Sequence, residues 1–299
     1  MLVEKLALLF AVVAITCVGA ATAGHAQNNR TFVSNTGVSG NTALGCSAAS
    51  PCDTFAHALS VTNAGGEINC LNAGEFGPVT ITQEVTINCE STSNGGITTS
   101  GANAIVVNTA GSVSLIGLDI NGMNVAGGNG VAIVSSGSVN IRNCKIHGFL
   151  ANETDTGFAI VSMPLSSGGN LVVDKVLLAY NSAGVGLLAV SSGASVNMTV
   201  RNSDINNNVA YGIVVDVANG GTHAGATIEQ TTLAFNGAAG LLASGAGAIA
   251  VLGSAAVVNN GAGIAAARGG IIYSFKNNQI GGNGTDGTPL TAYPGGPLN

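Results

Sequence analysis

A short apolar sequence that ends in asparagine and glycine recurs along this chain. Its clearest copies read INNNVAYGI from Ile205, LAFNGAAGL from Leu233 and IGGNGTDGT from Ile280. Successive closing glycines are separated by 27, 29, 26, 28, 23 and 24 residues, and they are Gly130, Gly157, Gly186, Gly212, Gly240, Gly263 and Gly287. A repeat of this length, with short apolar segments and Gly/Asn corners, predicts a β-solenoid in which each coil has three strands.

The residues ahead of each copy alternate between inward apolar and outward positions. The Ile or Leu position that anchors each coil is taken by Ile120, Ile146, Leu178, Ile205, Leu233, Ala256 and Ile280. The residues five and seven positions before the anchor are apolar and are predicted to point inward. In the last two coils these residues are Ile249, Val251, Tyr273 and Phe275. A period of two predicts a strand with one buried face.

Two columns of glycine and asparagine mark corners between the strands. Three residues before the anchor stand Gly117, Asn143, Asn202, Gly253 and Asn277, with Lys175 and Gln230 as exceptions. Both residue types tolerate a left-handed backbone, so this column predicts a sharp bend. A second column predicts the next corner and asparagine side chains that hydrogen-bond from coil to coil; it contains Asn181, Asn208, Asn236, Asn259 and Asn283.

These repeats resemble the right-handed parallel β-helix of the pectate-lyase-like superfamily, in which asparagine ladders recur at the bends. The segment RTFVSNTGVSGN, followed by SPCDTFAHALSVTNAGGEINC, resembles the start of exported bacterial β-helix proteins, where a short strand and a capping helix, here about residues 54–62, close the solenoid. The resemblance implies an all-β fold: a single right-handed parallel β-helix of about eight to nine three-strand rungs with an N-terminal capping helix. It implies no single activity, because the superfamily includes lyases, hydrolases, epimerases and adhesins.

The chain divides into four predicted segments. Residues 1–26 read as a secretory signal peptide, because Lys5 precedes an apolar run and small residues allow cleavage after Ala23 or Ala26; the alternative is an uncleaved anchor helix. Residues 27–65 are expected to form an opening strand and capping helix, 66–287 the β-helix and 288–299 a polar tail. We therefore expect an exported protein, located in the periplasm, at the cell surface or outside the cell.

Five cysteines follow the predicted signal peptide. In an oxidising compartment the sequence CSAASPC favours a short disulfide loop between Cys46 and Cys52. Cys70, Cys89 and Cys144 each end a strand-like run and are interpreted as buried small hydrophobic residues, with a Cys70–Cys89 bridge as the alternative. No C-x-x-C and no histidine pair at ligand spacing occurs, so neither a metal site nor a cofactor is predicted.

Charged residues are few, and their arrangement limits the function. Only 7% of residues are charged, the net charge is −6 and no basic run occurs, which argues against nucleic-acid binding. The outward column Arg142, Asp174, Arg201 and Glu229 alternates in sign, with Lys145 and Asp204 on the next outward column. Coils about 4.8 Å apart would let these charges form a ladder that fixes register. The alternative is a platform that binds an acidic sugar.

The strand after each closing glycine is apolar on both of its faces. Whichever face is buried, the other is aliphatic, and Asp216 is its only charged residue. Such a strip predicts contact with the C-terminal tail, a second copy or a cell-surface partner.

The favoured function is therefore a non-catalytic surface, adhesion or structural module, with a polysaccharide as a candidate partner. The alternative is a polysaccharide lyase or glycoside hydrolase. A lyase of this type needs a base and a cation at the substrate carboxylate, whereas the ladder offers only single alternating acids, so no catalytic residue is assigned. Only 4% of residues are aromatic, which leaves few side chains to stack on sugar rings.

Overall fold

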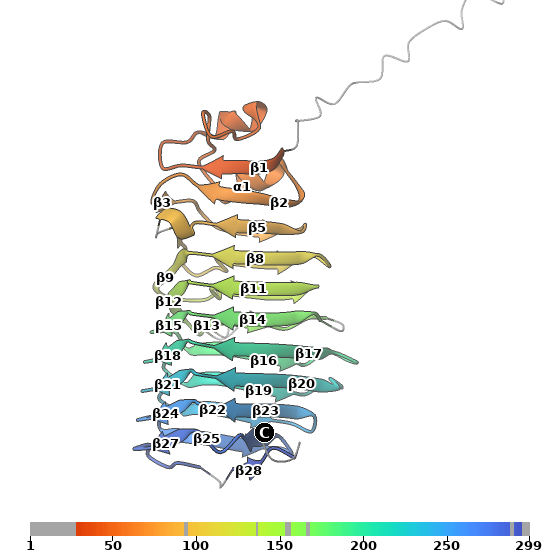
Figure 1. Cartoon of the computed structure of the whole chain (residues 1–299), viewed down its shortest axis with the longest axis vertical. Coiled ribbons are helices and arrows are strands. Elements are labelled where there is room, and N and C mark those ends of the chain that lie inside the picture. Colours follow the sequence, from red (N-terminus) through yellow and green to blue (C-terminus); the bar gives the residue numbers. More distant parts are fainter. Residues whose placement is uncertain are drawn as a thin grey trace, which may run out of the picture.

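The computed structural model describes residues 28–92, 95–135, 137–152, 157–165, 168–287 and 290–294. The predicted signal peptide, residues 1–26, lies outside the described residues. Among those described, no helix has the length and apolar character needed to span a membrane. The protein is a stack of coils, each of which passes through three β-sheets in turn (Figure 1).

The strands in the described residues form three sheets, and all strand pairs between coils are parallel. Sheet A has 11 strands: β1 (Asn28–Val33), β2 (Thr62–Cys70), β5 (Val85–Asn88), β8 (Ser112–Ile116), β11 (Ser138–Arg142), β14 (Asn170–Asp174), β17 (Ser195–Arg201), β20 (His223–Glu229), β23 (Ala248–Gly253), β26 (Ile271–Ser274) and β28 (Thr291–Ala292). Sheet B has nine: β3 (Gly74–Glu75), β6 (Gly95–Thr98), β9 (Leu118–Ala126), β12 (Lys145–Leu150), β15 (Leu177–Ala179), β18 (Asp204–Asn206), β21 (Thr232–Ala234), β24 (Ala256–Val258) and β27 (Gln279–Gly281). Sheet C has eight: β4 (Val79–Ile81), β7 (Ile105–Asn108), β10 (Val131–Ser135), β13 (Phe158–Ser162), β16 (Ala183–Ala189), β19 (Tyr211–Val217), β22 (Ala239–Ser244) and β25 (Ala262–Ala267).

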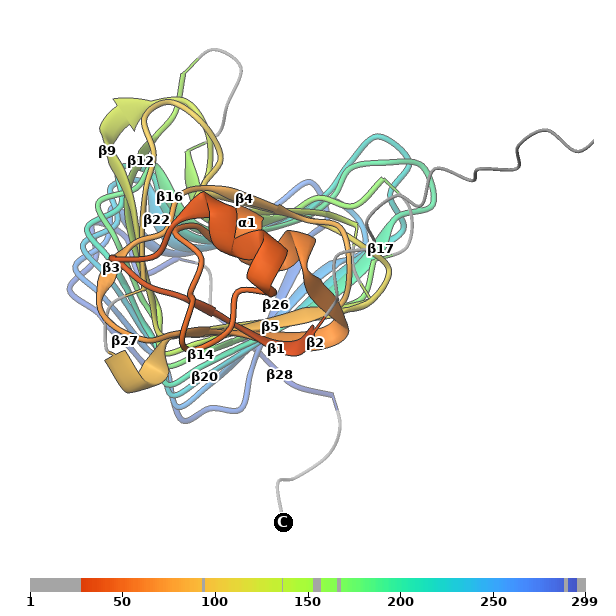
Figure 2. The ribbon, with the colours of Figure 1, turned by 90° about the horizontal axis from the view of Figure 1, so that it is seen from above.

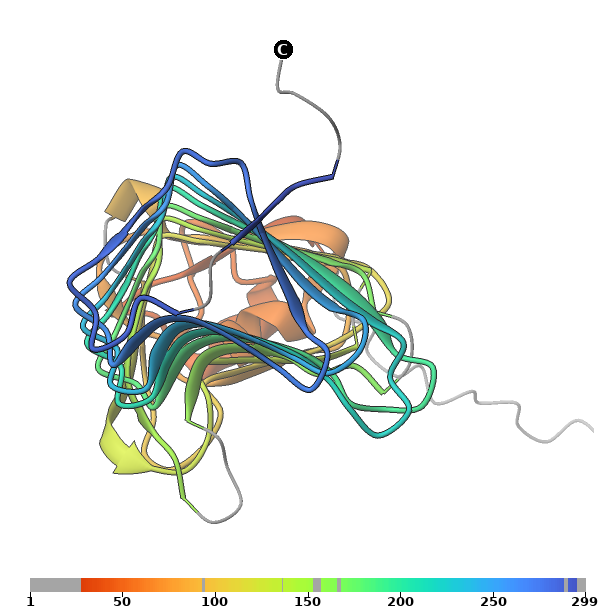
Figure 3. The same cartoon turned by 90° about the horizontal axis from the view of Figure 1, so that it is seen from below.

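The predicted all-β solenoid with three strands in each coil is confirmed. Viewed along its axis, the stack has a three-sided outline, and loops extend outward at its corners (Figures 2 and 3). Among the described residues, helix is confined to α1 (Phe55–Ser60) and the short 3-10 helices η1 (Ser39–Leu44) and η2 (Glu90–Thr92). Helix α1 lies at the N-terminal end within the predicted range, and its function as a cap stays a prediction.

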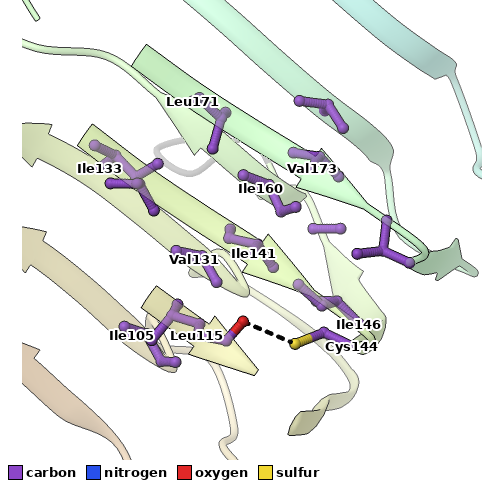
Figure 4. Close-up of a cluster of buried hydrophobic side chains, with 14 of the residues drawn as sticks. Ile105, Leu115, Val131, Ile133, Ile141, Cys144, Ile146, Ile160, Leu171 and Val173 are labelled. Atoms are coloured by element: carbon purple, nitrogen blue, oxygen red, sulfur yellow. Dashed lines mark hydrogen bonds between the residues drawn. The ribbon is translucent and has the colours of Figure 1, made fainter. Parts of the chain in front are cut away.

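The core runs through the centre of the stack and receives side chains from all three sheets. In Figure 4, Leu115 and Ile141 of sheet A face Ile146 of sheet B and Ile105 and Val131 of sheet C. All five are fully buried. Burial of each aliphatic side chain stabilises the fold by about 1.5–3 kcal/mol, so these continuous apolar rows hold the coils together.

The predicted asparagine ladder occupies the corner between sheets B and C. The Asn208 side-chain amide donates to Asn236 Oδ1 at 2.9 Å, and Asn236 donates to Asn260 Oδ1 at 2.9 Å. Asn181 precedes them and Asn283 follows. The prediction that Asn259 belongs to the ladder is wrong. Asn259 is exposed, and the buried Asn260 occupies the ladder position in this coil.

The predicted register is also wrong in the last two coils. Leu233 pairs with Val257 instead of with Ala256, because this coil has one residue fewer than its predecessor between the ladder asparagine and the closing glycine. A slip of one residue exchanges the two faces of a strand. In this coil the residues that point inward are therefore Ala250 and Leu252, instead of Ile249 and Val251. In the last coil the predicted anchor Ile280 is in register with Val257, but the bend between β26 and β27 is one residue longer, so Ile272 and Ser274 point inward instead of Tyr273 and Phe275.

Four of the five cysteines in the described part of the chain are joined in two disulfides. Cys46 bonds to Cys52, and Cys70 bonds to Cys89. The second bond differs from the favoured interpretation of these cysteines as buried small residues; it forms because Asn69 pairs with Asn88, which places the next residues of two adjacent coils side by side. Cys144 is free and buried, its Sγ approaches the Leu115 carbonyl (Figure 4), and burial raises its pKa to about 11.

Candidate functional site

The predicted charge ladder lies at the carboxyl end of the sheet A strands. Arg142, Asp174, Arg201 and Glu229 occupy one register position in four successive coils. Asp174 is the most enclosed of them, with its side chain 11% exposed. It accepts hydrogen bonds from Arg201 and from the Asn202 amide, the latter at 2.9 Å. This part of the ladder links two coils through one carboxylate.

The pKa of Asp174 reflects these partners. Burial raises the pKa of the carboxyl, but the Asn202 hydrogen bond and the Arg201 charge together outweigh burial, and the pKa lies below its ordinary value. The carboxylate is therefore ionised at neutral pH and is already hydrogen-bonded, which is the chemistry of a structural ion pair.

Arg142 does not bond to its neighbour in the ladder, Asp174. Its guanidinium instead bonds to Glu90 of η2 at 3.2 Å, and Glu90 also accepts a hydrogen bond from the Asn143 side chain. The sequence offers no signal for this contact, because Glu90 belongs to a 3-10 turn that interrupts the repeat. Two acid–arginine–asparagine groups, centred on Glu90 and Asp174, thus replace the continuous ladder.

Lys145 and Asp204 lie around the bend, on the outer face of sheet B. Leu177 stands between them in register, so they are two coils apart. Lys145 faces Asp119 at 3.8 Å, and Asp119 also contacts His147 at 3.0 Å. A depression of about 520 Å³ runs along this bend, lined by Lys145, Asp204, Asp119, Lys175, Asn143 and Asn202. The structure therefore gathers the predicted residues near one corner, where Arg142, Lys145, Asp174 and Arg201 belong to three separate ion pairs.

A second hollow, not expected from the sequence, lies on the outer face of sheet A. It has a volume of about 420 Å³ and is lined by Asn170, Val172, Asn197, Thr199, His223, Gly225, Thr227 and Val251, among others. Gly225 lacks a side chain, and a Cβ there would lie 2.6 Å from His223 Nε2 and 3.0 Å from Asn197 Oδ1. The sequence signal that could have indicated this hollow was the alternation of Asn, Thr and Ser residues along these strands.

The outer face of sheet C is less open than the predicted aliphatic strip. Phe158 lies across Gly186, where a Cβ would come within 2.8 Å of the ring. With Ala132, Val161 and Val214 it forms a small cluster of buried residues outside the main core. Asp216, predicted to be the only charge on this face, forms an ion pair with Arg268.

Groups of three or more His, Cys, Asp or Glu side chains arranged to hold a metal ion do not occur among the described residues.

Comparison with known proteins identifies the family of this chain. The sequence model of the family described as "Right handed beta helix region" matches residues 79–280. Among solved structures, the chain is similar to the crystal structure of pectate lyase Pel9A, with 14% sequence identity, a TM-score of 0.49 and coverage of 84% of this chain and 75% of that one. No curated protein matches. Residues 79–280 include the repeats that define the coils, and the chain belongs to the right-handed β-helix family.

Proposed function

We propose that this protein is exported and acts as a non-catalytic binding module that holds an extended polysaccharide on the outer face of sheet A. One observation carries the proposal: short polar side chains form two rows along the solenoid axis on this face. The first row is Ser112, Ser138, Asn170 and Asn197. The second is Ser114, Asn140, Thr199 and Thr227, interrupted once by Val172 between Asn140 and Thr199. All these polar residues are at least partly exposed. Hydroxyl and amide groups both donate and accept, as sugar hydroxyls require.

The hollow at Gly225 supports a binding role for this face. Its volume of about 420 Å³ falls within the range of small-molecule sites, about 300–1,000 Å³. Polar groups from three adjacent coils surround it, including the Asn197 amide, the Thr227 hydroxyl and the His223 imidazole, with His223 Nε2 at 3.3 Å from Asn197 Oδ1. One or two sugar units of a longer chain would enter here.

The nearest charged groups favour binding over catalysis. Hydrolysis of a glycosidic bond uses a pair of carboxyl groups about 5–10 Å apart, one of them free to donate a proton. Asp174, which borders this face, is instead ionised and bonded to Arg201 and Asn202. Export is supported by the two disulfides, which persist in oxidising compartments.

Binding assays with the purified secreted form test this proposal. We expect retention on one or more neutral or acidic polysaccharides without release of reducing ends or unsaturated products. The variant Gly225→Val fills the hollow and should reduce affinity at least about tenfold. This is the expected loss if the contacts of one sugar unit contribute more than about 1.4 kcal/mol to the binding free energy. Ala256→Val, which adds a similar volume on the outer face of sheet B, serves as the control.

Three results would contradict the proposal. Product release would favour the lyase or hydrolase alternative. Absence of binding to every polysaccharide would remove the binding role itself. Equal binding by Gly225→Val and the wild type would remove sheet A as the binding face.

A further inference from the structure

The corner between sheets B and C contains two aromatic residues in an unusual backbone conformation. From the coil of β12 on, each coil turns here through one left-handed residue, which directly precedes the ladder asparagine in every coil but that of β12, where Phe149 follows. Along the stack these residues are Gly148, Tyr180, Asn207, Phe235, Asn259 and Gly282, with φ between 54° and 78°. Glycine and asparagine tolerate this conformation, whereas bulky side chains adopt it only at an energetic cost. Tyr180 and Phe235 therefore add backbone strain that the other coils avoid.

The strain is not offset by burial. Tyr180 is 61% exposed and Phe235 is 57% exposed. In the coil between them, Val209 is also exposed, by 66%. Large residues that are strained and solvated contribute little to folding, and strain of this kind is concentrated at functional sites. This corner thus presents apolar groups outward at a cost to stability.

The spacing of the two rings follows from the strand register. Ala179 pairs with Asn206, and Asn206 pairs with Ala234, so the residues that follow them, Tyr180, Asn207 and Phe235, occupy equivalent places in successive coils. Two coils separate the aromatic residues, which is about 9.6 Å along the solenoid axis. The exposed amide of Asn207 lies between them.

We propose that Tyr180, Asn207 and Phe235 form a platform for a linear β-1,4-linked glycan that lies parallel to the solenoid axis. Aromatic faces pack against the apolar faces of sugar rings. In an extended β-1,4 chain every second ring presents the same face, and this disaccharide repeat is close to two coils in length. Asn207 is then placed to hydrogen-bond hydroxyls of the middle ring. The inference rests on the proposed polysaccharide-binding function. It adds a second surface that contacts the polysaccharide and names the class of polysaccharide that binds there.

Substitution by asparagine tests the platform without disturbing the fold. Asn207 and Asn259 already occupy this corner position in other coils, so the double variant Tyr180→Asn/Phe235→Asn should melt at the wild-type temperature or higher. Its binding to microcrystalline cellulose or chitin should fall at least about tenfold. Starch and β-1,3-glucan, which lack a flat two-fold repeat, should bind equally weakly to both proteins. Leu165→Asn removes a 79% exposed apolar residue elsewhere and is the matched control.

Each outcome separates this inference from the proposed function. If the wild type binds a glycan and the double variant binds it equally, the platform is wrong and the sheet A proposal stands. If the wild type binds no glycan, the proposed function fails as well. Equal loss in Leu165→Asn would mean general apolar adsorption and would overturn the platform. A lower melting temperature of the double variant would show that the rings stabilise the fold and would also overturn it.

Discussion

Asp174 links two coils at the scale of a single residue, and this link should depend on pH. Its native pKa lies below the ordinary value of 3.8, so its stabilisation is complete above that value and is lost as the pH falls through the lower native pKa. Asp174→Asn should therefore lower the free energy of unfolding by about 1.5–3 kcal/mol at pH 7, the range for hydrogen bonds to charged groups. Denaturant titrations between pH 7 and pH 2 should show this difference shrinking in acid.

Glu229→Gln provides the control at the same register position. Glu229 is exposed, so its substitution should change stability by no more than about 0.5 kcal/mol at any pH. A difference between wild type and Asp174→Asn that stays constant into acid would contradict the ionic origin of the stabilisation. The register of Asp174 was predictable from the repeat, whereas the partner of Arg142 was not, because Glu90 lies outside the repeat.

At the scale of elements, the asparagine ladder holds the B–C corner of successive coils. Asn236 accepts from Asn208 and donates to the Asn260 side chain and the Ile205 carbonyl. Asn236→Ala removes these hydrogen bonds and also the one that Asn236 Oδ1 accepts from the Asn208 backbone N–H, whereas the Asn208 amide keeps the Leu178 carbonyl and Asn260 Oδ1 keeps the backbone N–H of residue 236. A buried polar group left unpaired costs about 1–3 kcal/mol. We therefore expect a lower denaturation midpoint, measured by circular dichroism in urea.

Asn259→Gly is the matched control for the ladder. Asn259 is exposed and has a φ of 56°, a conformation that glycine adopts freely, so its substitution should leave the midpoint almost unchanged. Equal midpoints for the two variants would show that the ladder adds nothing. The sequence predicted the column of asparagines, but a corner shortened by one residue hid which of Asn259 and Asn260 points inward.

At the scale of the whole molecule, the C-terminal end of the stack is covered by the tail. Leu290 packs against the core, Thr291 pairs with Tyr273 in sheet A, and the Tyr293 ring makes edge-to-face contacts with Tyr273 and Phe275. Deletion of residues 288–299 would expose the edge of β26 and the end of the core. Because uncapped solenoid ends associate, sedimentation should show dimers or larger species.

Deletion of residues 295–299 alone leaves these contacts in place and should sediment as the full chain does. If removal of 288–299 also has no effect on sedimentation, the tail is not a cap. Self-association of the full chain would instead support the predicted contact through the aliphatic outer face of sheet C.

The sequence by itself determined the repeat length, the three-strand coil, the buried face of most strands and the asparagine corners. These features follow from local periodicity, which any window of one coil contains. The tertiary structure decided which cysteines bond, which arginine meets which acid, where Gly225 leaves a hollow and which corner carries Tyr180 and Phe235 two coils apart. Each of these depends on the register between coils. One inserted or missing residue at a corner changes that register, and only the packed core fixes it.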